Sequence, residues 1–538
     1  MNRIQSLIPI VFVLAGCASI SSPNGGPKDK TPPKLLSSLP EHNTTGFRGK
    51  TIQLTFDEDL KLKNPKEEMI ISPSVGKEID VTLKGSRVFI TPKNGWADST
   101  TYNILFREAI QDITEGNIPA NLRLAFSTGP QIDTLHITGR VTHLLKGSNA
   151  DKITVAVYQS DTFNIFKHTA SYLTKSNQHG VFRLDNLKEG DYHLYAFDDK
   201  NKNLKIESRT EKFGFLKDTL HLKENIDSLV LGLISLDTRP LKLNTFRRTG
   251  LLSRIRFSKA VVDYNIQSQP QLENTIPDSP DEVVIWNPQS LTDSVKIKLS
   301  ATDSLNNKLD TTFYVKRSDA RTVKDNFKWA AEDLLIDPET GLFTAKIRYN
   351  KPLQSIQYDS ISILLDTTAI FHIPKEQFDI NSKLKKINIH YQMDKKLFEG
   401  NADPLINIKI GKGFLVSIDN DSTKALKDQP TIPWPETTGI LLLQTETKHD
   451  NYIIQLMSPE GHVLHSYPNL VKQTIKQIPP GDYAIRIIID TNANQQWDAG
   501  NPILHIEPEP VLYYLTNEKK RNFPIRANWE LGPLILKF

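Results

Sequence analysis

The run DTNANQQWDAGN carries the most suggestive set of oxygen ligands in the 538-residue chain. Positions 1, 3, 5 and 9 of this run are occupied by Asp490, Asn492, Asn494 and Asp498. Carboxylate and amide oxygens are the ligands that Ca²⁺ prefers, and alternate spacing in a tight loop turns them toward one point. The run therefore predicts weak calcium binding, and no other cofactor is expected.

An earlier stretch repeats the pattern with Asp199, Asn201, Asn203 and Glu207. Both runs depart from a complete calcium loop, because Gln495 or Leu204 replaces the usual glycine and no glutamate stands at the closing twelfth position. The later run resembles the calcium loops of Gram-positive adhesin B-repeats, which implies the metal. The alternative is an Asx-rich turn, in which the side chains bond to the backbone of their own loop.

Cys17 is the only cysteine in the chain, and it follows a short leader. Residues 1–16 hold one positive charge and an apolar stretch of about nine residues, which is too short to span a bilayer and typical of a signal peptide. Leu-Ala-Gly-Cys resembles the bacterial lipobox, which implies cleavage before Cys17 and acylation of its thiol and new N-terminus. The alternative is an ordinary secretory signal in which the cysteine has no role.

The mature chain would begin with a flexible tether, because residues 17–33 are rich in Pro, Gly and Ser. Ala18 and Ser19 follow the cysteine in place of aspartate, which by analogy with lipoprotein sorting implies the outer membrane. The acidic cluster of surface-export signals is missing, so the sequence leaves the membrane face open. Without a second cysteine, a disulfide framework and a cysteine-based zinc site are both excluded.

Alternation of apolar and polar residues dominates the remaining chain, with residues 52–56 and 406–410 as two examples. Short alternating strands separated by Gly, Pro, Asn and Asp predict an all-β fold of antiparallel sandwiches. A single sandwich accounts for roughly 100 residues, so several are expected in series. The helical spacing of residues 324–335 predicts one short helix.

Residues 34–130 carry the sharpest resemblance to a known family. The strand that ends at Phe56, the TTY before the strand of Tyr102, the D…GN turn at Asp112 and the closing FST resemble the bacterial Ig-like domain of S-layer and envelope proteins. The resemblance implies a β-sandwich. The acidic trio Asp57, Glu58 and Asp59 is interpreted as a solvated turn rather than as catalytic carboxylates.

Two further ranges, 131–240 and 436–538, are predicted to be copies of one domain type. Residues 184–203 match residues 475–494 at a constant offset of 291 without a gap. Their F-x-L-x-x-L-x-x-G-x-Y-x-L pattern resembles the transthyretin-like, carboxypeptidase-regulatory β-sandwich. The resemblance implies a companion domain without catalytic residues, in which a tyrosine bonds back to the backbone at a strand corner.

The range between these copies is expected to hold two more Ig-like sandwiches. Residues 241–323 give weak signals, with RIRFSKAV as the clearest strand. Residues 324–435 read as a degenerate copy of the first Ig-like domain, because IRYNKPL stands where LTFDEDL stood. The predicted order is thus Ig-like, transthyretin-like, Ig-like, Ig-like, transthyretin-like.

No local catalytic signature is present: the chain has no His-Glu-x-x-His, Gly-x-Ser-x-Gly or phosphate-binding glycine loop. His462 and His465 are expected to be ordinary surface or core residues, and Trp529 a core or seam residue rather than a sugar platform. Positive and negative residues are interspersed, so no nucleic-acid partner is expected.

Together these features resemble the Ig-like outer-membrane lipoproteins of Bacteroidota and predict a non-catalytic scaffold or protein-interaction module. The expected partners are the membrane, through the lipid anchor, and other envelope proteins. The alternative function is glycan binding, which coplanar exposed aromatic side chains would favour.

Overall fold

The computed structural model describes residues 28–76, 78–159, 163–249, 252–275, 279–286, 293–316, 326–366, 369–382, 384–399 and 404–538. The predicted signal peptide and Cys17 lie outside the described residues. Helical turns in the described part of the chain are α1 Pro65–Glu68, η1 Tyr358–Ser360, η2 Lys375–Gln377, η3 Lys395–Leu397 and η4 Pro435–Thr437. None of these described helices has the length and apolar character needed to cross a membrane.

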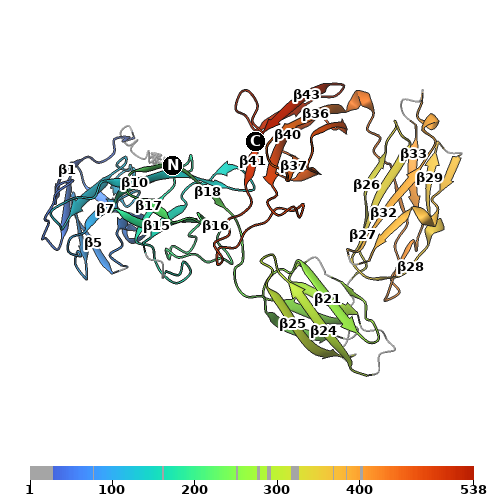
Figure 1. Cartoon of the computed structure of the whole chain (residues 1–538), viewed down its shortest axis with the longest axis horizontal. Helices are drawn as coiled ribbons and strands as arrows, with labels where there is room; N and C mark the ends of the chain where they lie inside the picture. Colours follow the sequence, from blue (N-terminus) through green and yellow to red (C-terminus); the bar gives the residue numbers. More distant parts are fainter. Residues whose placement is uncertain are drawn as a thin grey trace, which may run out of the picture. The chain divides into compact units, whose positions relative to one another are not determined.

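The chain divides into two compact units. The first holds the described residues up to His136 together with 171–173 and 185–189, and the second holds the rest of the chain to Phe538. Strands dominate both units, and Figure 1 shows them as short arrows joined by turns. The all-β fold predicted from the alternation is thereby confirmed.

The first Ig-like sandwich is built from three antiparallel sheets with the orders β1-β2-β6-β5, β4-β7-β9 and β3-β8. Its strands are β1 Leu35–Leu39, β2 Ile52–Phe56, β3 Leu60–Leu62, β4 Ile70–Ser72, β5 Ile79–Lys84, β6 Arg87–Pro92, β7 Thr101–Leu105, β8 Ile110–Asp112 and β9 Arg123–Ser127. Alternate residues of β2 are fully buried and meet β7 and β9 across the core through Tyr102 and Phe126. The period-two pattern therefore sets which side of each strand faces the core.

Strands β10 to β18 form the second sandwich. Its strands are β10 Leu135–His143, β11 Ser148–Asn149, β12 Thr154–Tyr158, β13 Tyr172–Lys175, β14 Val181–Leu187, β15 Gly190–Phe197, β16 Phe213–Phe215, β17 Leu220–Leu222 and β18 Ile226–Leu233. One sheet has the order β11-β10-β14 with β18 on β10, and the other has β13-β12-β15-β16 with β17 on β15.

Strands β36 to β43 form the C-terminal sandwich, which repeats this topology. Its strands are β36 Gly439–Glu446, β37 Tyr452–Met457, β38 Val463–Pro468, β39 Lys472–Ile478, β40 Gly481–Ile489, β41 Val511–Tyr513, β42 Asn522–Ile525 and β43 Glu530–Lys537. One sheet has the order β39-β36-β43, and the other has β38-β37-β40-β41 with β42 on β40. The Tyr483 hydroxyl donates to the carbonyl of Pro479 at 2.7 Å, which is the corner bond that the sequence pattern predicted.

Both copies differ from the purely antiparallel sandwich that we expected. The first strand pairs in parallel with the last one, β10 with β18 and β36 with β43. Parallel neighbours need a long connection, and here the whole domain supplies it. The sequence pattern of single strands does not reveal this pairing, because it shows which residues are buried and not which strands are neighbours.

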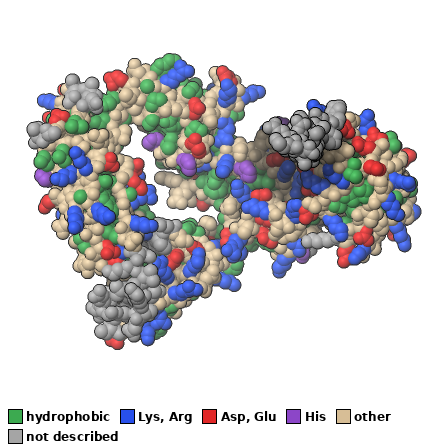
Figure 2. All heavy atoms as spheres, turned by 180° about the vertical axis from the view of Figure 1, so that it is seen from behind, with side chains coloured by type: hydrophobic (Ala, Val, Ile, Leu, Met, Phe, Trp, Pro, Cys, Tyr) green, Lys and Arg blue, Asp and Glu red, His purple; other side chains and the backbone are tan. Residues whose placement is uncertain are grey.

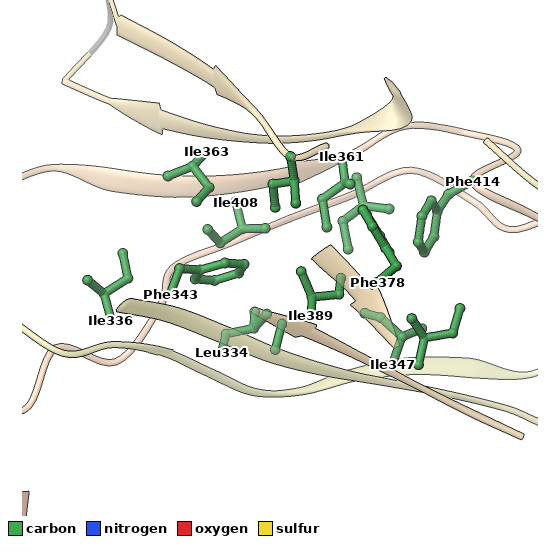
Figure 3. Packing of buried hydrophobic residues seen from close by; sticks show 14 of the residues in the cluster. Leu334, Ile336, Phe343, Ile347, Ile361, Ile363, Phe378, Ile389, Ile408 and Phe414 are labelled. Carbon is green, nitrogen blue, oxygen red and sulfur yellow. The ribbon is translucent and has the colours of Figure 1, made fainter. Parts of the chain in front are cut away.

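The third and fourth sandwiches fill the range between the copies. The third consists of β19 Leu243–Thr249, β20 Leu252–Phe257, β21 Asp263–Ser268, β22 Asn274–Thr275, β23 Glu282–Trp286, β24 Val295–Thr302 and β25 Lys308–Val315. The fourth consists of β26 Trp329–Ile336, β27 Leu342–Tyr349, β28 Leu353–Ile356, β29 Ile361–Leu365, β30 Ala369–His372, β31 Phe378–Asn381, β32 Lys386–Gln392, β33 Ile406–Ile410, β34 Leu415–Ser417 and β35 Leu426–Asp428. Figure 3 shows the core of the fourth, where Phe343 and Ile389 face Ile363 and Ile408 of the opposite sheet.

The helix expected at 324–335 is wrong: residues 329–335 belong to strand β26, and no described residue of the range is helical. Trp329 and Ala331 pack partly against the core, and Leu334 and Ile336 are buried in it. A bulge between Glu332 and Leu335 changes the spacing from two residues to three. An apolar step of three residues imitates a helix in the sequence, although it arises here from one extra residue in a strand.

Candidate functional site

The C-terminal Asp-Asn loop begins where β40 ends. The Asp490 side chain is buried, and its two carboxylate oxygens accept the backbone N–H groups of Asn494 at 3.2 Å and Gln495 at 2.8 Å. Asn492 Oδ1 also accepts the N–H of Asn494, at 3.1 Å. The side-chain amides of Asn492 and Asn494 both donate to Asp498 Oδ2 at 2.7 Å. The four predicted ligands therefore do meet in one loop, held there by bonds among themselves.

The earlier loop, after β15, has the same pattern. Asp199 accepts the N–H groups of Asn203 and Leu204 at 3.0 and 3.1 Å, and Asn201 Oδ1 accepts the N–H of Asn203 at 3.0 Å. The Asn203 amide donates to Glu207 at 3.2 Å. These side chain-to-backbone bonds are those of the Asx-turn alternative. Calcium binding by either loop stays a prediction.

The residues that replace the usual glycine adopt the backbone conformation of a glycine. Gln495 has φ +62° and Leu204 has φ +60°, both in the left-handed region. An L-residue pays roughly 1 kcal/mol or more for this conformation. The departure at this position therefore costs stability without preventing the loop from forming.

Two buried glutamates complete the loops, and the sequence analysis missed both. Glu509 accepts the N–H of Thr491 at 2.6 Å and the N–H of Asp498 at 3.0 Å, so it ties the start of the loop to its end. Glu211 accepts the N–H groups of Lys200 and Glu207 at 3.0 and 2.9 Å. Burial raises the pKa of Glu211, and its backbone bonds oppose this rise. Glu211 and Glu509 are 298 residues apart, whereas the two repeats match at a constant offset of 291. The two glutamates therefore do not align when the repeats are compared without a gap.

A second recurrent cluster lies in the Ig-like sandwiches, two residues after the aromatic end of a core strand. In the third sandwich the Lys259 ammonium lies 2.5 Å from Asp303 Oδ2, and both side chains are buried. In the fourth, Lys351 is 1 % exposed and lies 2.6 Å from carboxylate oxygens of both Asp419 and Asp421. Each lysine thus pairs with an aspartate of a neighbouring turn: Asp303 accepts the N–H groups of Leu305 and Asn307, and Asp419 accepts the Ser417 hydroxyl.

The first sandwich has an acid where the other two have the lysine. Glu58 and Asp29 each place a carboxylate oxygen within 4.8 Å of one on Asp112. Burial raises the pKa of Asp112, but the N–H groups of Gly116, Asn117 and Glu115 outweigh it and lower that pKa to about 2. Burial and then the Asp112 charge raise the pKa of Glu58. Of the acidic trio read as a solvated turn, Asp57 and Asp59 are exposed, whereas Glu58 is half-buried.

Two further expectations concern single aromatic or imidazole side chains. Trp529 is 60 % exposed, so the expectation of a core or seam residue is wrong. The backbone carbonyl of Trp529 accepts the N–H of Ile440. The exposed ring stacks with the Arg526 guanidinium, which lies 4.9 Å from the ring centre. His462 and His465 are exposed, as expected for surface residues.

Comparison with known proteins identifies the first sandwich. Residues 29–128 match the bacterial Ig-like domain. The family match begins inside the predicted tether, where the backbone carbonyl of Asp29 accepts the side-chain amide of Asn117 at 3.1 Å. The chain is therefore an all-β protein of serial sandwiches that contains a bacterial Ig-like domain at residues 29–128.

The similarity of this chain to solved structures is low in both sequence identity and TM-score. The surface-layer protein SbsC, domains 1–6, is 10 % identical with a TM-score of 0.16, over 91 % of this chain and 67 % of that one. The major pilin subunit BcpA of Bacillus cereus is 9 % identical with a TM-score of 0.13, over 76 % of this chain and 99 % of that one. No curated protein matches the chain.

Proposed function

We propose that this protein is a non-catalytic lipoprotein of the outer membrane, anchored through Cys17, whose sandwiches form a scaffold for other envelope proteins. One observation carries the proposal: in the described residues, the side chains of the recurrent polar clusters form hydrogen bonds that hold turns in place. Asp112, Asp490 and Glu509 all bond to backbone N–H groups of their own loops. Groups saturated in this way serve a rigid framework rather than acid–base catalysis.

Glycan binding, the alternative, draws less support from the aromatic side chains. Among the described residues, the strongly exposed aromatics are Tyr314 at 56 % and Trp529 at 60 %. They belong to the third and the C-terminal sandwich, so no single sandwich presents two of them as a platform. Figure 2 shows basic and acidic side chains intermixed on the visible face, which fits protein partners better than nucleic acid.

The anchor is the most direct test of the proposal. Changing Cys17 to serine removes the thiol that would be acylated, so we expect uncleaved precursor or released protein in place of a membrane-bound mature chain. Fractionation of the outer membrane with radiolabelled palmitate incorporation would measure both effects. A Ser19→Ala variant, which keeps the cysteine, is the matched control. A mature-sized Cys17→Ser chain that still fractionates with the outer membrane would rule out lipid anchoring.

The scaffold role needs a partner. Detergent-solubilised outer membranes should yield a stoichiometric partner complex when the chain is pulled down through a C-terminal tag. Recovery of the chain alone, together with retention on immobilised envelope polysaccharide, would favour the glycan-binding alternative instead.

Calcium at the Asp-Asn loops is proposed as a weak and separate property. Four oxygens without a closing glutamate suit a dissociation constant of about 10⁻⁴ to 10⁻³ M, so millimolar calcium should add about 1 kcal/mol of stability. Calorimetric melts with EDTA and with several millimolar calcium would measure the shift. An Asp490→Ala variant should abolish it in the C-terminal sandwich. Equal melting temperatures in EDTA and in calcium would leave these residues as turn-formers.

A further inference from the structure

Arg486 is an unusual residue for a central strand, because its side chain lies on β40 and is only 8 % exposed. Arginine is almost never buried unless its charge is paired or hydrogen-bonded. Within its own sandwich, Arg486 Nε donates to Gln455 Oε1 at 2.8 Å. This bond satisfies one of the five guanidinium donors, so the burial of the rest needs a further partner.

The partner comes from the second sandwich, more than 300 residues earlier in the chain. At the turn between β10 and β11, the carbonyl of Leu145 accepts Arg486 Nη1 at 2.7 Å. The adjacent carbonyl of Leu144 accepts the Tyr513 hydroxyl at 2.9 Å, and that of Lys146 accepts Arg521 Nη1. Three successive backbone carbonyls are thus bonded by three side chains of the C-terminal sandwich.

The turn fits this surface closely. Gly147 has φ +59°, and a Cβ added there would lie 2.4 Å from the Tyr513 ring. The Arg521 guanidinium lies over the same ring, 3.9 Å from its centre. A second contact joins the two sandwiches where the N–H of Lys217 donates to Glu507 Oε1 at 2.9 Å.

The surface that contains Arg486 and Tyr513 has different side chains in the second sandwich. Tyr195 opposes Phe215 between β15 and β16, and Arg486 opposes Tyr513 at the matching place between β40 and β41. In the second sandwich this pair consists of two stacked aromatic rings, and the ring centre of Phe163 of the same domain lies 5.8 Å from that of Tyr195. In the C-terminal sandwich the connection after β37 is a short turn, Ser458–His462, that supplies no such cover.

We propose that the C-terminal sandwich and the second sandwich bind each other as an intramolecular clasp, which holds together the two ends of the intervening range 241–435. Tyrosine and arginine in a desolvated contact are the residue types that carry most binding energy at protein interfaces. Because both domains lie on one chain, closure of the clasp is intramolecular and needs only modest affinity. This inference does not depend on the lipid anchor or on the scaffold role.

The distance between the two sandwiches in solution tests the clasp. The full chain with Cys17→Ser has no cysteine, so Asp151→Cys and Lys472→Cys introduce two unique spin-label sites on exposed residues of the two domains. Electron–electron double resonance should give one narrow distance distribution. The double variant Arg486→Ala/Tyr513→Phe should lose it in favour of a broad one. Gly147→Ala, which acts from the other side of the contact, should have the same effect.

Arg526→Ala is the matched control, because this arginine of the same domain stacks on Trp529 and has no bond to the turn. It should keep the narrow distribution. A broad distribution in the unaltered chain, or a narrow one that survives both Arg486→Ala/Tyr513→Phe and Gly147→Ala, would overturn the clasp. Dilution of labelled chain with unlabelled chain would separate a contact between two copies, because only an intermolecular distance would fade. Such fading would also overturn the proposal.

Discussion

Replacing Lys351 with methionine should lower the free energy of unfolding of the fourth sandwich by about 3 to 5 kcal/mol, the usual cost of removing one partner from a buried ion pair. Methionine fills the space of the lysine stem but leaves Asp419 and Asp421 without a cation. The Asp419 side chain is 9 % exposed, so water compensates it poorly. Hydrogen exchange in peptides covering β27 and β29 would report the local loss in the full chain.

The pH dependence of this loss provides a second readout. Burial raises the pKa of Asp419, but its bonds to Lys351 and Ser417 outweigh that and lower the pKa below 3.8. A carboxylate whose pKa is lower in the folded state stabilises above its unfolded pKa and loses that contribution as the pH falls through the folded value. Burial lowers the pKa of Lys351 and its two carboxylate partners raise it beyond 10.5, so the lysine side of the pair persists to strongly alkaline pH.

The difference between the parent chain and Lys351→Met should therefore be constant from about pH 5 to pH 9 and shrink below about pH 4. Lys409→Met is the matched control, because Lys409 is an exposed residue of β33. It should change the free energy of unfolding obtained from the exchange by no more than a few tenths of a kcal/mol. If Lys351→Met were as stable as this control at pH 7, the ion pair would contribute nothing net.

The position of this lysine could be read from the sequence, but its partners could not. RFSKAV and IRYNKPL align with LTFDEDL, so Lys259, Lys351 and Glu58 fall at one place. Asp419 follows Lys351 by 68 residues, and only the folded sandwich brings the two together. Alternation shows which side of a strand is buried, whereas the pairing of distant turns depends on the strand order.

The strands could be predicted because the burial of one face leaves a local pattern in the sequence. The order of the strands could not, because that pattern does not show which strands are neighbours. A buried face leaves a period-two signal in every strand, as in β2 and β33. The signal failed at β26, where a bulge shifted the period, and at the parallel pairs, which have no local signature. The Asp-Asn loops were found because their ligands are close in sequence. Glu509 was missed because seven additional residues separate it from the loop, compared with Glu211.

Glu509→Ala should destabilise the C-terminal sandwich by about 1 to 3 kcal/mol, because it leaves backbone donors at both ends of the loop without their acceptor. The lost partners are the N–H and hydroxyl of Thr491 and the N–H of Asp498. The Glu509 side chain is 4 % exposed, so the vacated space gives water limited access. Glu509→Gln keeps one amide oxygen and should lose about half as much, which separates the hydrogen bonds from the packing of the side chain.

Glu518→Ala is the matched control, because this glutamate of the same domain is 73 % exposed and pairs only with the exposed Lys520. Hydrogen exchange across residues 490–500 should speed up in Glu509→Ala and stay unchanged in Glu518→Ala. The same change at Glu211 should loosen the loop at 199–207, because that glutamate bonds both ends of its loop in the same way. Exchange in Glu509→Ala as slow as in the control would mean that the side chains of Asp490 and Asn492 hold the loop without the glutamate.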